Sequence, residues 1–202
     1  MPTELGTRRQ PKQERSRLKV ESILDAAEQL LIEAGYDALT TTAVSERSGV
    51  AVGSLYQYFH AIDDIVDGMM ARCAERFADR LEVDLIGATF TRKRDAANAA
   101  LDSFVAFYRE DRVLRVLRTA RPLGSVMGFG PAADRIMGVV AEALVGQGLA
   151  SEVDEHFALE VEVQWATAEA LVLLAFRRDA DGDPVVLAHL RRLFDLDVEE
   201  VG

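Results

Sequence analysis

Apolar residues recur about every 3.6 positions along almost the whole chain after residue 15, and no segment alternates like a half-buried strand. In the first such segment Ile23, Leu24, Ala27 and Leu31 share one face. The pattern therefore predicts an all-α protein. Helices are expected over 18–34, 40–48, 52–59, 62–85, 97–108, 113–117, 131–146, 152–178 and 184–196.

Residues that commonly begin or end helices stand between these segments. Gly35 and Gly49 supply helix stops, and the threonines at 40–42 offer N-cap hydroxyls. Asp183 followed by Pro184 combines a cap residue with a first-turn proline. These signals place most of the expected helix boundaries.

Residues 40–59 carry the strongest functional signal, because two short helices joined by a glycine turn are typical of a helix-turn-helix. They are too short to be stable alone, so we expect them to pack on the helix over 18–34. The packing residues would be Val44, Val50, Leu55 and Phe59. The residues left facing outward, whose groups suit base edges and phosphates, are Val52, Gly53, Ser54, Tyr56, Gln57 and Tyr58. A three-helix bundle with no nucleic-acid role is the alternative.

From about Arg17 to Val66 the chain resembles the DNA-binding domain of the TetR (tetracycline-repressor) family of bacterial transcriptional regulators. The resemblance lies in the run ILDAAEQLLIEAGYDALTT, the SGV turn, and LYQYF followed by DDIV. It implies a homodimer whose second short helix enters the major groove of a palindromic DNA operator. It also implies a C-terminal part that binds a small-molecule effector. The implied DNA contacts are Thr41, Thr42, Gly53, Ser54, Tyr56, Gln57 and Tyr58.

Four positions depart from the family's usual pattern. Ser45 stands where a small alanine is usual, and Ala51 and Ala61 replace common Ser/Thr caps. Each lost cap is expected to cost about 1 kcal/mol of local helix stability. Ile62 replaces a lysine that commonly meets a phosphate, so no ionic contact is assigned there.

The net charge of -11 argues against non-specific coating of nucleic acid, but the charge is unevenly spread. Residues 1–19 carry +4, residues 20–62 carry -5, and residues 63–202 carry -10. We therefore expect a flexible basic arm over 1–14 that attracts phosphates ahead of a DNA-binding domain over 15–62. The basic residues expected to contact DNA are Arg8, Arg9, Lys12, Arg15 and Arg17. A solvated tail is the alternative.

Residues 63–202 are expected to form a helical effector-binding and dimerisation domain. The second half of the helix over 152–178 is apolar nearly all round, so a second subunit is a plausible partner. The helix over 184–196 has a matching stripe, and two helices from each chain would form a four-helix seam. The stripe residues are Val186, Leu190, Leu193 and Phe194. Complete burial inside one subunit is the alternative.

The same region is rich in aromatic and methionine side chains, which suit a cavity for an apolar effector. An ordinary core is the alternative for each of them. His156 and Gln164 are polar candidates near the cavity, and the glycine-bearing loop at 121–130 is a candidate lid. The predicted ligand-binding residues are Phe104, Phe107, Tyr108, Met127, Phe129, Met137, Phe157 and Trp165.

No motif for catalysis, a cofactor or a metal is found, and no catalytic residue is assigned. The single cysteine, Cys73, excludes an internal disulfide, and three histidines make a transition-metal site improbable. The acids at 179–183 imitate a calcium loop, but Pro184 and Leu190 stand where that loop needs glycine and glutamate. With no signal peptide or membrane span, the expected location is the cytoplasm. The sequence thus predicts a ligand-responsive regulator, and a carrier with a vestigial helix-turn-helix or a helical enzyme are the alternatives.

Overall fold

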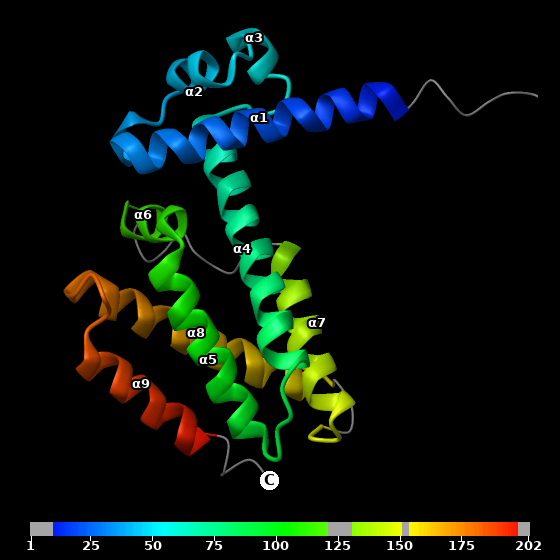
Figure 1. Cartoon of the computed structure of the whole chain (residues 1–202), viewed down its shortest axis with the longest axis vertical. Coiled ribbons are helices and arrows are strands. Elements are labelled where there is room, and N and C mark those ends of the chain that lie inside the picture. Colours follow the sequence, from blue (N-terminus) through cyan, green and yellow to red (C-terminus); the bar gives the residue numbers. More distant parts are fainter. Residues whose placement is uncertain (1–9, 121–130, 151–153, 198–202) are drawn as a thin grey trace, which may run out of the picture. The chain divides into compact units, whose positions relative to one another are not determined.

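The computed structural model describes residues 10–120, 131–150 and 154–197, and this part of the chain is built from helices without a strand (Figure 1). The all-α fold class is therefore confirmed. The helices are α1 (Gln10–Ala34), a 3-10 turn at Tyr36–Ala38, α2 (Thr41–Ser48), α3 (Val52–Leu55), α4 (Ile62–Ile86), α5 (Lys93–Glu110), α6 (Arg112–Ala120), α7 (Pro131–Gly146), α8 (Glu155–Arg178) and α9 (Pro184–Asp197).

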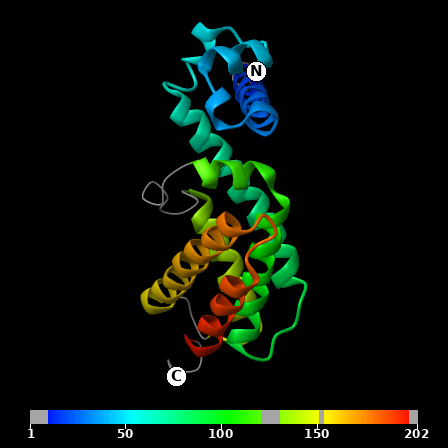
Figure 2. The same ribbon diagram turned by 90° about the vertical axis from the view of Figure 1, so that its left-hand side faces the viewer.

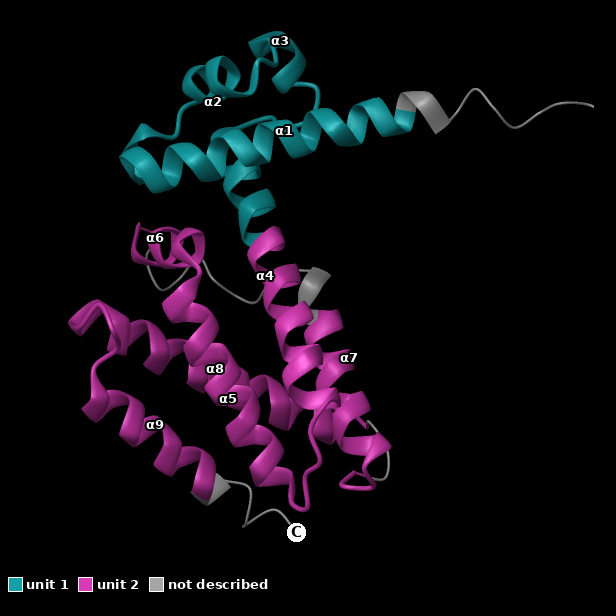
Figure 3. Ribbon diagram, in the orientation of Figure 1, with its two compact units in different colours: residues 1–70 teal, residues 71–202 magenta. Residues whose placement is uncertain are grey.

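The chain divides into two compact units, residues 1–70 and residues 71–202 (Figure 3). Helix α4 contributes its first turns to the first unit and the rest to the second, so one continuous helix belongs to both. The functional boundary that we expect at Ile62 lies earlier in the same helix and stays a prediction.

The first unit packs α1 against α2, with the buried side chains of Ile23, Ala27, Leu31, Val44 and Leu55 forming its core. Helix α1 begins at Gln10, well before the predicted start at residue 18. Residues 10–14 are therefore helical, contrary to the expected flexible arm over 1–14. The physical reason is that Gln, Lys, Glu and Arg are good helix formers, and a proline is tolerated in a first turn.

Helix ends in the first unit follow the expected capping chemistry. The hydroxyl of Thr40 accepts a hydrogen bond from the backbone N–H of Ala43 at 3.1 Å, and Gly49 ends α2 with a φ of 69°. The carboxylate of Asp64 accepts from the backbone N–H of His60 at 2.6 Å and of Ala61 at 3.2 Å. Asp64 thus supplies at the start of α4 the cap that Ala61 lacks.

In the second unit the core lies between α4, α5, α6 and α8, where Phe77, Leu81, Phe104, Leu114 and Val172 are fully or almost fully buried. Phe77 also packs against Phe104 with ring centroids 5.3 Å apart. These contacts hold four helices around one apolar centre.

Helix α9 packs on α8 and α5 (Figures 1 and 2). Its Leu190 and Phe194 are buried inside the subunit, so these two members of the predicted seam stripe belong to the subunit's own core. These two residues are buried where α9 packs on α8 and α5, and an ion pair between Arg191 and Asp102 at 2.5 Å joins α9 to α5. Asp183 caps α9 as predicted, accepting from the N–H of Val185 at 2.9 Å.

Candidate functional sites: a helix-turn-helix surface and a buried cavity

The turn between α2 and α3 is fixed by serine side chains. Ser45 is buried, and its hydroxyl donates to the carbonyl of Val50 at 2.6 Å. Ser48 accepts from the N–H of Val50 at 3.2 Å, and Ser22 on α1 donates to the carbonyl of Ser48 at 3.2 Å. Ser45 therefore closes the turn with a hydrogen bond that an alanine could not make.

The second helix of this motif is shorter than predicted, because α3 ends at Leu55 and not at residue 59. Hydrogen-bonded turns continue to Phe59, whose N–H donates to the carbonyl of Leu55 at 3.0 Å. Gly53 and Gln57 are exposed, and Tyr56 is 47% exposed. Ser54 and Tyr58 are half-buried. A Cβ added at Gly53 would meet nothing within 4 Å, so the fold itself does not require glycine there.

Two hydroxyl contacts bring the predicted DNA-contacting residues together. The hydroxyls of Thr41 and Tyr56 lie 3.4 Å apart, which joins the start of α2 to the end of α3. Ser16 on α1 donates to the hydroxyl of Tyr58 at 3.2 Å. The early turns of α1 therefore lie beside the end of the motif, and Thr42 is exposed next to Thr41.

Basic side chains are few in the described part of the first unit, and two of them pair with carboxylates. Arg15 and Arg17 are exposed on α1, but Arg17 pairs with Glu21 at 2.7 Å. Arg47 pairs with Glu33 at 2.7 Å, and this contact lowers the pKa of the carboxyl of Glu33. Of the remaining predicted contacts, Lys12 lies in α1, its side chain outside the described part, and Arg8 and Arg9 precede the described residues. The DNA-binding role of all these residues stays a prediction.

A cavity of about 980 Å³ lies within the second unit, between α4, α5, α6, α7, α8 and α9. Its lining includes Phe104, Met137, Phe157 and Trp165, four of the predicted ligand-binding residues, together with both predicted polar candidates, His156 and Gln164. Most of the other lining side chains are aliphatic. The cavity therefore suits a largely apolar molecule.

Two other predicted ligand-binding residues do not line the cavity. Phe107 and Tyr108 are buried beside it: Phe107 packs on Phe77 at 5.3 Å and Tyr108 on Phe176 at 4.8 Å between ring centroids. Met127 and Phe129, with the candidate lid at 121–130, lie outside the described residues.

The sequence did not predict the pairing of Arg118 on α6 with Glu169 on α8, two lining residues that form a buried ion pair. The side chain of Arg118 is 4% exposed and that of Glu169 is 16% exposed. Burial lowers the pKa of Arg118 and raises the pKa of Glu169, because a charge loses hydration in both cases. The one available signal was Glu169 itself, an acid within an otherwise apolar helical stretch.

Tyr108 lies close enough to Arg118 and Glu169 for both charges to act on its phenol. Burial raises the pKa of its phenol to about 12, and its hydroxyl has no hydrogen-bond partner among the described residues. A mutually neutralised ion pair that lines the cavity therefore lies near an un-ionised phenol that is buried beside the cavity.

The exposed edge of the cavity is acidic. Asp134, Glu160 and Glu162 line it against a single lysine, Lys93. The imidazole of His156 lies 3.3 Å from the carboxylate of Glu160. An approaching anion would meet net negative charge at this edge.

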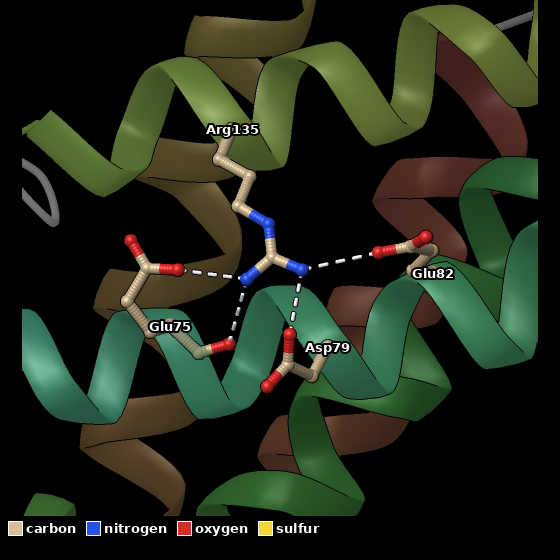
Figure 4. A network of polar contacts seen from close by, with 4 residues as sticks. All are labelled: Glu75, Asp79, Glu82 and Arg135. Carbon is tan, nitrogen blue, oxygen red and sulfur yellow. Dashed lines mark hydrogen bonds and ion pairs between the residues drawn. The ribbon is translucent and has the colours of Figure 1, made fainter.

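Arg135 on α7 binds three carboxylates that project from successive turns of α4 (Figure 4). Its guanidinium lies 2.7 Å from Glu75, 2.6 Å from Asp79 and 3.1 Å from Glu82. These contacts raise the pKa of Arg135 above its ordinary value. Since Asp134 and Met137 line the cavity, α7 contacts both the cavity and the helix shared by the two units.

Known proteins match the chain in both its parts. The family model for bacterial regulatory proteins of the tetR family matches residues 23–69. A TetR-family transcriptional regulator from Streptomyces coelicolor is 32% identical, with a TM-score of 0.68 over 89% of this chain and 95% of that one. The chain belongs to the TetR family. The resemblance inferred from the 17–66 segment is thereby confirmed.

Two further proteins are similar to the chain at lower identity or over less of their length. The HTH-type transcriptional repressor KstR of Rhodococcus jostii is 43% identical over 58 residues, which is 29% of this chain and 27% of that protein. RolR in complex with resorcinol shares the fold at 18% identity, with a TM-score of 0.65 over 89% of each chain. The matches to curated relatives span 27% to 36% of those proteins' lengths.

Two other kinds of site are absent from the part of the chain that the structure describes. Among those residues, no helix has the length and apolarity to span a bilayer. No group of three or more His, Cys, Asp or Glu side chains is arranged to hold a metal ion there.

Proposed function

We propose that this TetR-family chain is a ligand-responsive transcriptional repressor that binds a palindromic DNA operator as a homodimer in the bacterial cytoplasm. The observation that carries the proposal is the pairing of a helix-turn-helix surface in one unit with a large apolar cavity in the other. Helix α4 belongs to both units, so one continuous helix connects the cavity-bearing unit to the unit that carries the helix-turn-helix surface, here called the reading surface.

The proposed dimer seam uses α8 and the exposed parts of α9. Three large apolar side chains form one exposed stripe on α8: Leu159 is 56% exposed, Val163 is 55% exposed and Leu174 is 45% exposed. Leu159 and Val163 also line the cavity, so the seam would border the effector site. On α9, Val185 is 74% exposed. Covering such a stripe with its symmetry mate removes apolar surface from water. Two reading heads held by this seam would contact two half-sites.

The proposed release step starts in the cavity. An effector changes the spacing of the two heads only to the extent that it binds the two arrangements with different affinity. Helix α7 is the candidate intermediary, because Arg135 binds α4 while its neighbours Asp134 and Met137 line the cavity. RolR with resorcinol supports the general point that this fold accommodates a small molecule.

The test of the DNA-binding proposal is selection of genomic fragments by the purified protein, followed by footprinting. We expect enrichment of fragments with a palindrome, protected at two half-sites and retained against competitor DNA. A protein that binds small molecules but enriches no fragment would instead be a carrier with a vestigial helix-turn-helix. Turnover of a bound compound would favour the enzyme alternative.

The seam has its own test in the molar mass of the protein by light scattering. The wild-type chain should be a dimer at micromolar concentration, and Leu174→Glu should shift it towards monomer because it places a charge on the part of the α8 stripe that does not line the cavity. The matched control is Val83→Glu, which places the same charge on an apolar side chain that is 74% exposed on α4. A monomeric wild type would overturn the seam.

A further inference from the structure

The Arg118–Glu169 pair is the most buried ion pair among the residues that line the largely apolar cavity, and it bears on the chemistry of the effector. The inference rests on the proposed function, in which this cavity is the effector site. Arg118 comes from α6 and Glu169 from α8, so a molecule that reaches the pair contacts two helices at once. The pair is therefore the natural anchor for a polar group on an apolar ligand.

A charged ligand head group is poorly matched to this ion pair. Glu169 already neutralises Arg118, so a ligand carboxylate would put two anions on one guanidinium in a water-poor site. A ligand ammonium would face the guanidinium in the same way. Either ion would also lose its hydration without gaining a partner of its own.

The edge of the cavity adds a second argument against anions. Asp134, Glu160 and Glu162 outnumber Lys93 there, so phosphates or carboxylates would be repelled on entry. An uncharged oxygen avoids both penalties. A hydroxyl accepts from Arg118 and donates to Glu169, and a carbonyl accepts from Arg118, while the ion pair stays intact.

We propose that the effector is an uncharged, largely apolar molecule whose hydroxyl or carbonyl oxygen binds the Arg118–Glu169 pair. The cavity of about 980 Å³ is at the upper end of the range for small-molecule sites. Phe104 and Trp165, with ring centroids 4.7 Å apart, offer the apolar body an aromatic wall.

The test uses ten-carbon probes that differ only in the head group. Trp165 is the single tryptophan of the chain and lines the cavity, so its fluorescence reports occupancy. At pH 7.5 we expect 1-decanol and 2-decanone to bind at least tenfold more tightly than decanoate, decylammonium and decanoyl-CoA. Tighter binding of any charged probe, or no binding of the two uncharged ones, would overturn the inference.

A variant assigns the selectivity to the pair and not to the cavity as a whole. Arg118→Met combined with Glu169→Leu replaces the pair by apolar side chains of similar length, an exchange that proteins often tolerate. The affinity ratio of 1-decanol to 1-chlorodecane should fall at least tenfold in this double variant. Met137→Leu is the control, because it changes the lining without touching the pair, and should leave the ratio unchanged. An unchanged ratio in a folded double variant would overturn the assignment.

Release of DNA is measured separately on a fragment retained in the selection experiment. Failure of a bound decanol to release that fragment would count against the ligand-responsive function, while the head-group preference would stand on the fluorescence data. Failure of the head-group preference would leave DNA binding untouched. The two failures are therefore distinguishable.

Discussion

Removing one partner of the Arg118–Glu169 pair is expected to destabilise the second unit far more than removing both. Arg118→Met leaves the carboxylate of Glu169 in a site where it is 16% exposed, and Glu169→Leu leaves a guanidinium that is 4% exposed. An uncompensated buried charge costs about 3–5 kcal/mol, whereas an apolar replacement of both partners is often neutral. The double variant should therefore unfold at a higher urea concentration than either single variant.

The two single variants should differ in their dependence on pH. Glu169 can take up a proton, and its folded-state pKa is already raised by burial. Losing Arg118 raises that pKa further above the unfolded value of about 4.3. The stabilisation by the neutral carboxyl is fully present below the unfolded pKa and is lost as pH rises through the folded pKa. The cost of Arg118→Met should therefore shrink from pH 8 towards pH 5, while the cost of Glu169→Leu should not shrink, because the arginine left behind keeps its proton.

The assay is urea unfolding followed by far-ultraviolet circular dichroism, at one protomer concentration because dimerisation contributes to apparent stability. In thermal scans each single variant should melt roughly 10 °C below wild type, at about 2–4 °C per kcal/mol for a chain of this size. The reasoning would be refuted if the losses of the single variants added up in the double variant. It would equally be refuted by single variants as stable as wild type.

Three further variants test the reading surface and the link between the units. Gly53→Ala should weaken DNA binding at unchanged melting temperature, because the added Cβ meets nothing in the free protein, whereas Gly49→Ala should lower the melting temperature through its φ of 69°. Replacing both Arg8 and Arg9 by alanine should reduce the slope of log affinity against log salt concentration by about 0.9 per lost phosphate contact. An unchanged slope in gel-shift titrations would show that the arm does not contact DNA phosphates. Arg135→Gln should leave probe fluorescence titrations unchanged but raise the probe concentration needed for DNA release; equal release would exclude the α7–α4 link.

Periodicity was sufficient to predict most of the helices because their apolar faces are long. The spans of α4 and α7 follow directly from it, and Asp183 marks the start of α9 by its side-chain chemistry. Short segments were less predictable. The segment after Leu55 keeps a helical apolar pattern but forms mixed turns, since a window of so few residues does not separate a helix from successive turns.

The cavity was only partly predictable from the sequence for a different reason. Aromatic side chains on amphipathic helices look the same whether they line a cavity, as Phe104 does, or pack beside it, as Phe107 does. The choice depends on small rotations of packed helices. The pairing of Arg118 with Glu169 is a contact between distant segments, and neither residue alone indicates its partner. The charge of each residue is evident from the sequence, but the ion pair in which the two charges neutralise each other is not.

The acidic total and the proposed DNA partner are compatible because charge acts locally. At physiological salt, charges separated by more than about 8 Å of solvent are largely screened, so most acids of residues 63–202 act little on a distant phosphate. Near the helix-turn-helix surface, Arg17 and Arg47 already pair with carboxylates, so the unpaired positive charge is expected mainly from the arm and the start of α1. Non-specific affinity should then be modest, and much of the affinity for an operator is expected from polar contacts at residues such as Tyr56 and Gln57, doubled by a second subunit. Modest non-specific affinity favours discrimination between DNA sequences, because binding then depends mainly on the contacts that a particular operator provides.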